Sequence, residues 1–185
     1  MINYKKNIYW FFKNVYSSNE INNINKLVDK NYFIGPNTAA EGVTKTSVVK
    51  TFELGKISIL DRFLLCCLDA NKFNFGYNLY MPQSNLDVHH LTYDEKFKSE
   101  YDWHLDLIFN HPATDLKLTC ILNVSDEPFE GGSLWLASGE PIEVKEIIEP
   151  GSAVIFPSFI MHKVDPVIKG KRKVIALWLS GPNFQ

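Results

Sequence analysis

Near its C-terminal end the chain reads EPGSAVIFPSFIMHKVDPVIKGKR, from Glu149 to Arg172. The short apolar run at 153–156 is followed by a proline-containing turn and then by His162, a pattern typical of a buried β-strand and the turn that leaves it. A Pro-Gly pair precedes the run and a Lys-Gly pair follows it, as expected of turns between strands. This part of the chain therefore predicts closely spaced strands, one of which begins at a histidine.

The same pattern extends upstream to about residue 73. Short runs rich in aromatic and β-branched residues alternate with glycine-containing turns, and such runs are typical of strands. The expected strands are Phe73–Tyr80, Leu86–Tyr93, Tyr101–Leu107, Leu116–Asn123, Ser133–Ala137, Ile142–Ile148, Ala153–Phe156, His162–Val167 and Val174–Leu179. Eight or so short strands at this spacing predict a sandwich, a jelly roll or a small barrel.

The first third of the chain has helical periodicity instead. Apolar residues recur at helical spacing over 21–28, and Ser17, Ser18 or Asn19 can cap that helix. A second apolar stripe runs over 57–68. Helices that precede a block of strands are typical of α+β proteins in which the helices pack on the outside of one sheet.

Length and composition indicate a globular protein. The chain has 185 residues, of which 45% are hydrophobic and 22% charged. We expect a single domain over 1–185, with a mainly helical support region at 1–72 and a β core at 73–182. The net charge of −2 lacks the basic excess of proteins that grip nucleic acid, so no nucleic-acid partner is expected.

Cysteine usage and the absence of long apolar stretches indicate the compartment. Three cysteines without framework spacing predict reduced thiols in a reducing environment. No signal peptide and no membrane-spanning segment is predicted, because charged and polar residues interrupt the apolar runs. We therefore expect a cytoplasmic protein without a membrane partner, whose oligomeric state the sequence leaves open.

Three residues form a candidate metal site. His104 and Asp106 are two positions apart in an expected strand, so their side chains point to the same face. Alone this pair is weak evidence, but His162 offers a third ligand. Two histidines and one carboxylate on one side of a metal leave coordination positions open, as in non-haem Fe(II) oxygenases. A structural zinc site would instead use four protein ligands, usually including cysteine.

With these motifs in this order, the sequence resembles the Fe(II)- and 2-oxoglutarate-dependent dioxygenases, in particular the prolyl 4-hydroxylase-like branch of phage and bacterial type. The resemblance covers about 73–182 and is most specific over 150–182. The segments that carry it are Tyr93, Tyr101–Asp106, Leu118–Asn123, Glu130–Trp135, Pro150-Gly151, Phe156–Ser158, His162–Val164, Pro166-Val167, Gly170–Arg172 and Trp178. It implies a double-stranded β-helix (jelly-roll or cupin-like) core with the N-terminal helices packed outside.

The resemblance also implies a reaction. His104, Asp106 and His162 would bind the catalytic Fe(II), and 2-oxoglutarate and O₂ would take the open positions. Halogenases of the superfamily carry a small residue in place of the carboxylate, so Asp106 favours hydroxylation. An unactivated C–H would be hydroxylated, with succinate and CO₂ as coproducts and ascorbate as the expected reductant.

Arg172 stands where the family places the basic residue that grips the distal carboxylate of 2-oxoglutarate. A guanidinium offers two parallel donors to a carboxylate, which a lysine ammonium cannot do. If Lys171 and Lys173 face outward, strand alternation turns Arg172 inward. Tyr93 matches the tyrosine that hydrogen-bonds the cosubstrate.

Other residues compete for these roles or are set aside. Tyr101 and Tyr80 are alternatives to Tyr93. His89 and His90 are adjacent, so they point to opposite faces of a strand and at most one faces a cavity. We expect neither of them to bind iron.

The implied substrate is a prolyl residue in a peptide or protein. The alternatives are a free amino acid or other small molecule and, from another class of protein, a non-catalytic metal- or ligand-binding jelly roll. A peptide hydroxylase is expected to keep an open groove, for which 83–87 and 96–100 are the candidate rims.

Overall fold

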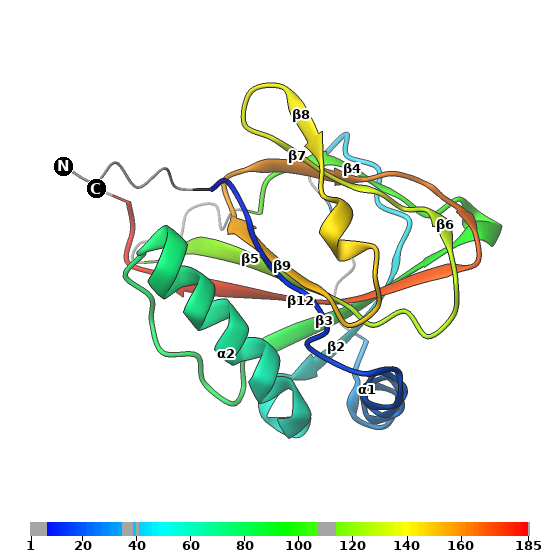
Figure 1. The fold of residues 1–185 in the computed structure, drawn as a ribbon, viewed down its shortest axis with the longest axis horizontal. Helices are drawn as coiled ribbons and strands as arrows, with labels where there is room; N and C mark the ends of the chain where they lie inside the picture. Colours follow the sequence, from blue (N-terminus) through cyan, green and yellow to red (C-terminus); the bar gives the residue numbers. More distant parts are fainter. Residues whose placement is uncertain (1–6, 35–38, 40, 107–113, 185) are drawn as a thin grey trace.

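A computed structural model describes residues 7–34, 39, 41–106 and 114–184. Two antiparallel sheets face each other (Figure 1). The larger sheet contains, in spatial order, β1 (Trp10–Phe12), β9 (Ala153–Pro157), β5 (Asp115–Asn123), β12 (Lys171–Gly181), β3 (Asp87–Asp94) and β2 (Val48–Glu53). The smaller sheet contains β4 (Tyr101–His104), β10 (Met161–Val164), β7 (Leu134–Ala137) and β8 (Pro141–Glu143), and a separate ribbon pairs β11 (Val167–Lys169) with β6 (Glu130–Gly131).

The larger sheet is buried on both faces, which explains why its central strands are almost continuously apolar. Along β12, Ile175 and Leu177 pack into the cluster that includes the helices. Val174 and Ala176, which alternate with them, pack into the cluster between the two sheets. The inner face of the larger sheet therefore presents every second residue of its strands to the space between the sheets.

The helices α1 (Ser18–Asn31) and α2 (Asp61–Ala70) lie on the outer face of the larger sheet (Figure 1), as predicted. Ser17 caps α1 and forms a capping box with Glu20. Shorter helical turns are η1 (Leu54–Lys56), η2 (Ser58–Leu60), η3 (Asn71–Phe75), η4 (Glu95–Phe97) and η5 (Lys145–Ile147). Among the described residues, none of the helices combines the length and apolar character needed to cross a membrane.

The structure corrects three expectations. The strand expected at Ile142–Ile148 is wrong beyond its start, because β8 ends at Glu143 and Lys145–Ile147 forms the helical turn η5. The predicted strand Phe73–Tyr80 is wrong: a π-helical turn extends α2 to Phe75, and Gly76 ends it in a left-handed conformation with φ of 72°. The region 1–72, expected to be mainly helical, also supplies strands β1 and β2 to the larger sheet. Both are edge strands whose pairing partners, β9 and β3, lie far away in the sequence, so local periodicity did not identify them.

Candidate metal and cosubstrate site

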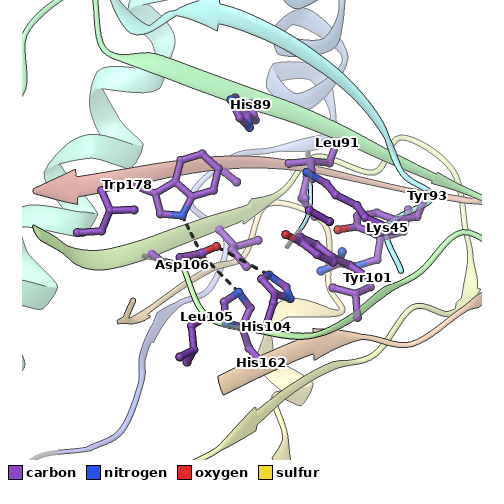
Figure 2. A pocket seen from close by; sticks show the side chains of 18 residues that line it. Lys45, His89, Leu91, Tyr93, Tyr101, His104, Leu105, Asp106, His162 and Trp178 are labelled. Atoms are coloured by element: carbon purple, nitrogen blue, oxygen red, sulfur yellow. Dashed lines mark hydrogen bonds and ion pairs between the residues drawn. The ribbon is translucent and has the colours of Figure 1, made fainter. Parts of the chain in front are cut away.

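Strand pairing brings the two candidate histidines together. In the smaller sheet, His104 of β4 lies directly opposite His162 of β10. Asp106 follows β4, where its backbone N–H donates to the Ser158 carbonyl at 3.1 Å. The Asp106 carboxylate lies 3.8 Å from His104 Nε2 and 3.4 Å from His162 Nε2 (Figure 2). One potential ligand atom from each of the three residues lies within 4.8 Å of the others, so they can share one ion.

Backbone carbonyls orient both imidazoles. His104 Nδ1 lies 2.7 Å from the Asp102 carbonyl and His162 Nδ1 lies 2.9 Å from the Ile160 carbonyl. A carbonyl only accepts hydrogen bonds, so each Nδ1 carries the proton and donates it, and each Nε2 keeps its lone pair for a metal. Burial lowers the pKa of His104 to about 4, which also favours the neutral ligand form.

Two hydrogen-bond donors from the larger sheet orient the Asp106 carboxylate. Its Oδ2 accepts hydrogen bonds from Trp178 Nε1 at 2.8 Å and from Thr119 Oγ1 at 2.8 Å. Although burial raises the pKa of Asp106, the adjacent imidazole of His162 and the hydrogen bond from Trp178 lower it well below the ordinary value. Trp178 and Thr119 are register partners on β12 and β5, a pairing that sequence reasoning missed because it joins residues 59 positions apart.

Arg172 points into the interior, as strand alternation predicted. It is 1% exposed, whereas Lys171 and Lys173 on either side form ion pairs with aspartates. Among the described residues, neither terminal nitrogen of the Arg172 guanidinium has a hydrogen-bond partner. The guanidinium lies 5.3 Å from the ring of Tyr93, its register partner on β3. A buried fork of unpaired donors is a site for an anion.

All these side chains face one cavity of about 460 Å³ between the two sheets. Tyr93 and Arg172 line it from the larger sheet, and the three ligand candidates line it from the other side. The competing Tyr101 also lines the cavity, but its ring stacks on His104 with centroids 3.5 Å apart. Tyr80 is 46% exposed and lines a separate surface groove.

Adjacent histidines on β3 face opposite sides, as predicted. His89 lines the cavity, and its ring meets Trp178 edge-on with centroids 4.9 Å apart. His90 is buried on the helix side, where Nε2 lies 3.1 Å from the Asn25 amide oxygen. Neither belongs to the group of three residues that could share a metal.

Lys45 also lines the cavity and was not predicted. Its ammonium lies 4.9 Å from the centre of the Tyr101 ring. The residue stands in an irregular segment before β2, where the sequence carries no periodic signal that could have identified it.

Comparison with known proteins places this geometry in a family. The family model described as the 2OG-Fe(II) oxygenase superfamily matches residues 88–180, half of the chain. The chain belongs to the 2OG-Fe(II) oxygenase superfamily. A PKHD-type hydroxylase of Synechococcus sp. (strain CC9605) is 36% identical over 95 residues, which make up 50% of this chain and 42% of the relative. The chain thus spans about two fifths of the length of the curated relatives it matches.

Solved structures of oxygenases share the fold. A prolyl-4-hydroxylase of Pseudomonas putida superposes with a TM-score of 0.68 at 16% identity, covering 95% of this chain and 94% of that one. A prolyl hydroxylase of Trichoplax adhaerens, solved in complex with a peptide fragment of the hypoxia inducible factor oxygen degradation domain, superposes with a TM-score of 0.65 at 18% identity, covering 94% and 83%. The predicted double-stranded β-helix core with outer helices is thereby confirmed.

Proposed function

We propose that this oxygenase is an Fe(II)- and 2-oxoglutarate-dependent hydroxylase. The observation that carries the proposal is the convergence of two kinds of group on one cavity. A cluster of two imidazoles and a carboxylate faces it from one side. A buried guanidinium, whose terminal nitrogens have no hydrogen-bond partner in the described part of the chain, faces it from the other. A metal and a dicarboxylate together would satisfy both.

The donor set suits ferrous iron. His104, Asp106 and His162 would hold the ion through two neutral imidazole nitrogens and one carboxylate oxygen, the arrangement that leaves open positions in non-haem iron oxygenases. When bound, iron supplies the O₂ chemistry that oxidises 2-oxoglutarate to succinate and CO₂ and hydroxylates a C–H bond. The chain's own contribution is to orient the ligands, since hydrogen bonds fix both imidazoles and the far oxygen of the carboxylate.

Arg172 and Tyr93 would bind the distal carboxylate of 2-oxoglutarate. Val174 and Ile121 line the same cavity and belong to the apolar cluster between the sheets. These apolar side chains limit water and strengthen the ionic contact made by the guanidinium.

We infer a prolyl residue in a peptide or protein as the leading substrate, with a free amino acid or other small molecule as the alternative. A surface groove formed by residues from 80–87 and 178–180 supports a peptide, because Trp178 lines both this groove and the cavity. The Trichoplax relative was solved with a peptide bound, which favours the same class.

Succinate formation tests the proposal. Purified protein supplied with Fe(II), ascorbate and 2-oxoglutarate is expected to release succinate, and prolyl peptides are expected to accelerate the release. His104→Ala and Asp106→Ala should abolish it, because each removes a ligand. Asp29→Ala is the matched control, since Asp29 pairs with Lys50 on the helix side. Unchanged succinate formation in both ligand variants would refute the site, and no turnover with any substrate would favour a binding jelly roll.

A further inference from the structure

Lys45 is held in the cavity by backbone pairing. The segment around it bridges to β4: Lys45 is the bridge partner of Tyr101, and the Asp102 N–H donates to the Thr44 carbonyl at 2.9 Å. Thr44 and Thr46 on either side are exposed, so alternation turns the Lys45 side chain inward. The lysine is therefore placed by the same strand that carries His104.

The ammonium lies close to the reacting centre. It sits over the ring of Tyr101, and that ring stacks on His104. Figure 2 shows Lys45 and Tyr101 together on the side of the cavity opposite Trp178. Burial lowers the pKa of Lys45, while the negative charge of Asp106 raises it. An anion in the cavity would stabilise the charged form of this lysine further.

The proposed cosubstrate does not account for this charge. The keto acid end of 2-oxoglutarate would bind the metal, and its distal carboxylate would bind Arg172. Among the described residues that line the cavity, Asp106 is the one acidic side chain, and Lys45 and Arg172 are the basic ones. With a divalent ion and a 2-oxoglutarate dianion bound, the positive charges of the cavity exceed the negative charges by one. Buried charge of one sign favours a ligand group of the opposite sign.

We propose that Lys45 binds a carboxylate of the primary substrate and thereby selects substrates that carry a carboxylate next to the carbon to be hydroxylated. This inference rests on the proposed function and narrows its substrate class. The carboxylate belongs either to a free amino acid or to an acidic residue beside the target residue of a peptide. His89, which lines the cavity near Trp178, is a second polar group exposed to the same cavity.

Paired acid and amide probes test the inference. The first pair is L-proline and L-prolinamide, which reports a free amino acid carboxylate. The second pair is acetyl-Gly-Pro-Glu-amide and acetyl-Gly-Pro-Gln-amide, which reports an acidic neighbour in a peptide. Succinate formation by the Fe(II) enzyme gives KM and kcat for each probe, and calorimetry with the protein loaded with Mn(II) and 2-oxoglutarate gives affinities without turnover.

We expect the unaltered protein to prefer the acid of at least one pair about tenfold or more, the typical worth of a charge-assisted hydrogen bond. Lys45→Met should remove this preference through KM and leave the affinity for 2-oxoglutarate within about twofold, a change of less than 0.5 kcal/mol. Lys45→Arg should restore part of the preference. Lys50→Met is the matched control, because Lys50 pairs with Asp29 on the helix side of the same region.

Two results would overturn the inference while leaving the proposed function intact. One is an unaltered protein that favours neither acid over its amide. The other is a Lys45→Met protein that loses 2-oxoglutarate affinity instead of substrate preference, which would assign the lysine to the cosubstrate. Failure of the unaltered, metal-loaded protein to bind 2-oxoglutarate at all would reject the proposed function and the inference together.

Discussion

Arg172 is one of only two arginines in a chain that otherwise uses lysine for positive charge. The other, Arg62, pairs with Glu20 at 2.7 Å near the start of α1 and is partly exposed. The two guanidinium groups therefore differ in whether a carboxylate of the protein already binds them. Arg62 has its carboxylate within the protein, whereas the terminal nitrogens of Arg172 face the cavity without a partner among the described residues.

Replacing Arg172 tests its role directly. Arg172→Lys keeps the charge but loses the two parallel donors, so we expect the Kd for 2-oxoglutarate to rise about tenfold or more. Calorimetry on Mn(II)-loaded protein measures this. Arg62→Lys makes the same chemical change outside the cavity and should leave the affinity unaltered. An Arg172→Lys protein with unchanged affinity would show that the cosubstrate carboxylate binds elsewhere.

The Trp178 indole donates to Asp106, so we expect Trp178 to orient this candidate metal ligand. Trp178→Phe keeps an aromatic wall but removes the donor to Asp106 Oδ2, and loss of such an orienting bond typically costs about 10–100-fold in metal affinity. Anaerobic Fe(II) or Mn(II) titration is the measurement. Trp135→Phe is the control, because the Trp135 indole donates to Asp165, away from the cavity, at 2.6 Å. Equal metal affinity in the two variants would contradict the assignment.

At the scale of elements, one buried contact ties α1 to the larger sheet. The amide nitrogen of Asn25 donates to the Val124 carbonyl at 3.0 Å, so its oxygen accepts from His90 Nε2. Burial is the main cause that lowers the pKa of His90 to about 4, and the charges of Lys50 and Lys173 lower it further, so His90 is neutral near pH 7. The packing of helix on sheet thus depends on an uncharged histidine.

This contact predicts a pH dependence of stability. The folded-state pKa of His90 is below the unfolded value of about 6.5, so the unfolded chain binds the extra proton first. Stability is then complete above about pH 6.5 and is lost as the pH falls toward 4, by up to about 1.4 kcal/mol per pH unit for each such group. Urea unfolding between pH 7 and pH 4.5 measures the slope.

His90→Gln should reduce that slope by the contribution of one group. His104, whose pKa is also lowered to about 4, contributes separately, so part of the slope is expected to remain. His104→Ala therefore serves as the second arm of the comparison. An unchanged slope in His90→Gln would mean that the contact between α1 and β3 is not the titrating element.

Element prediction succeeded where the signal was local. The helix over 21–28 has its apolar stripe and its cap within one short segment, and the structure places α1 there with Ser17 as the cap. The expected strand Phe73–Tyr80 failed because its aromatic residues satisfy a strand pattern, while a π-helical turn continuing α2 uses the same residues. Strand propensity here was overridden by the continuation of α2, which buries Phe75 in the core on the helix side of the larger sheet.

At the scale of the whole molecule, the site joins the two sheets. The metal candidates belong to the smaller sheet and the turn that follows β4, whereas Arg172 and Tyr93 belong to the larger sheet. A metal and a dicarboxylate bound together would therefore add a connection between two parts of the fold that already meet through side-chain packing and through the hydrogen bonds to Asp106. Ligand binding should therefore raise the free energy of unfolding of the whole molecule.

Thermal unfolding measures this effect. Mn(II) and 2-oxoglutarate, each at about 100 times its Kd, should together stabilise the protein by about 2.7 kcal/mol or more, a rise in Tm of several degrees. 2-Oxoglutarate without the metal should stabilise it less, because only the Arg172 end is then held. His104→Ala should lose the joint effect and show no more than the smaller shift expected from 2-oxoglutarate alone. A joint shift that survives in His104→Ala would place the ligands outside this cavity.

The residue types and their order were readable from the sequence alone. Strand alternation correctly predicted that Arg172 faces inward, because the two-residue repeat of a strand is a local property. The same argument placed His104 and Asp106 on one face, and the structure brings them together although Asp106 lies beyond the end of β4. The resemblance to dioxygenases supplied the expected roles of these residues. The fold and the family that it implied are confirmed.

Only the tertiary structure decided which residues complete the site. The pairing of Trp178 with Thr119 behind Asp106 depends on the register between β12 and β5, and the position of Lys45 depends on a bridge between an irregular segment and β4. Strand register and β-bridges join distant parts of the chain, and the burial of whole sheet faces determines them. Local sequence carries no record of them. The candidate ligand residues were therefore predictable from the sequence, while the residues that support them and the proposed substrate contact were not.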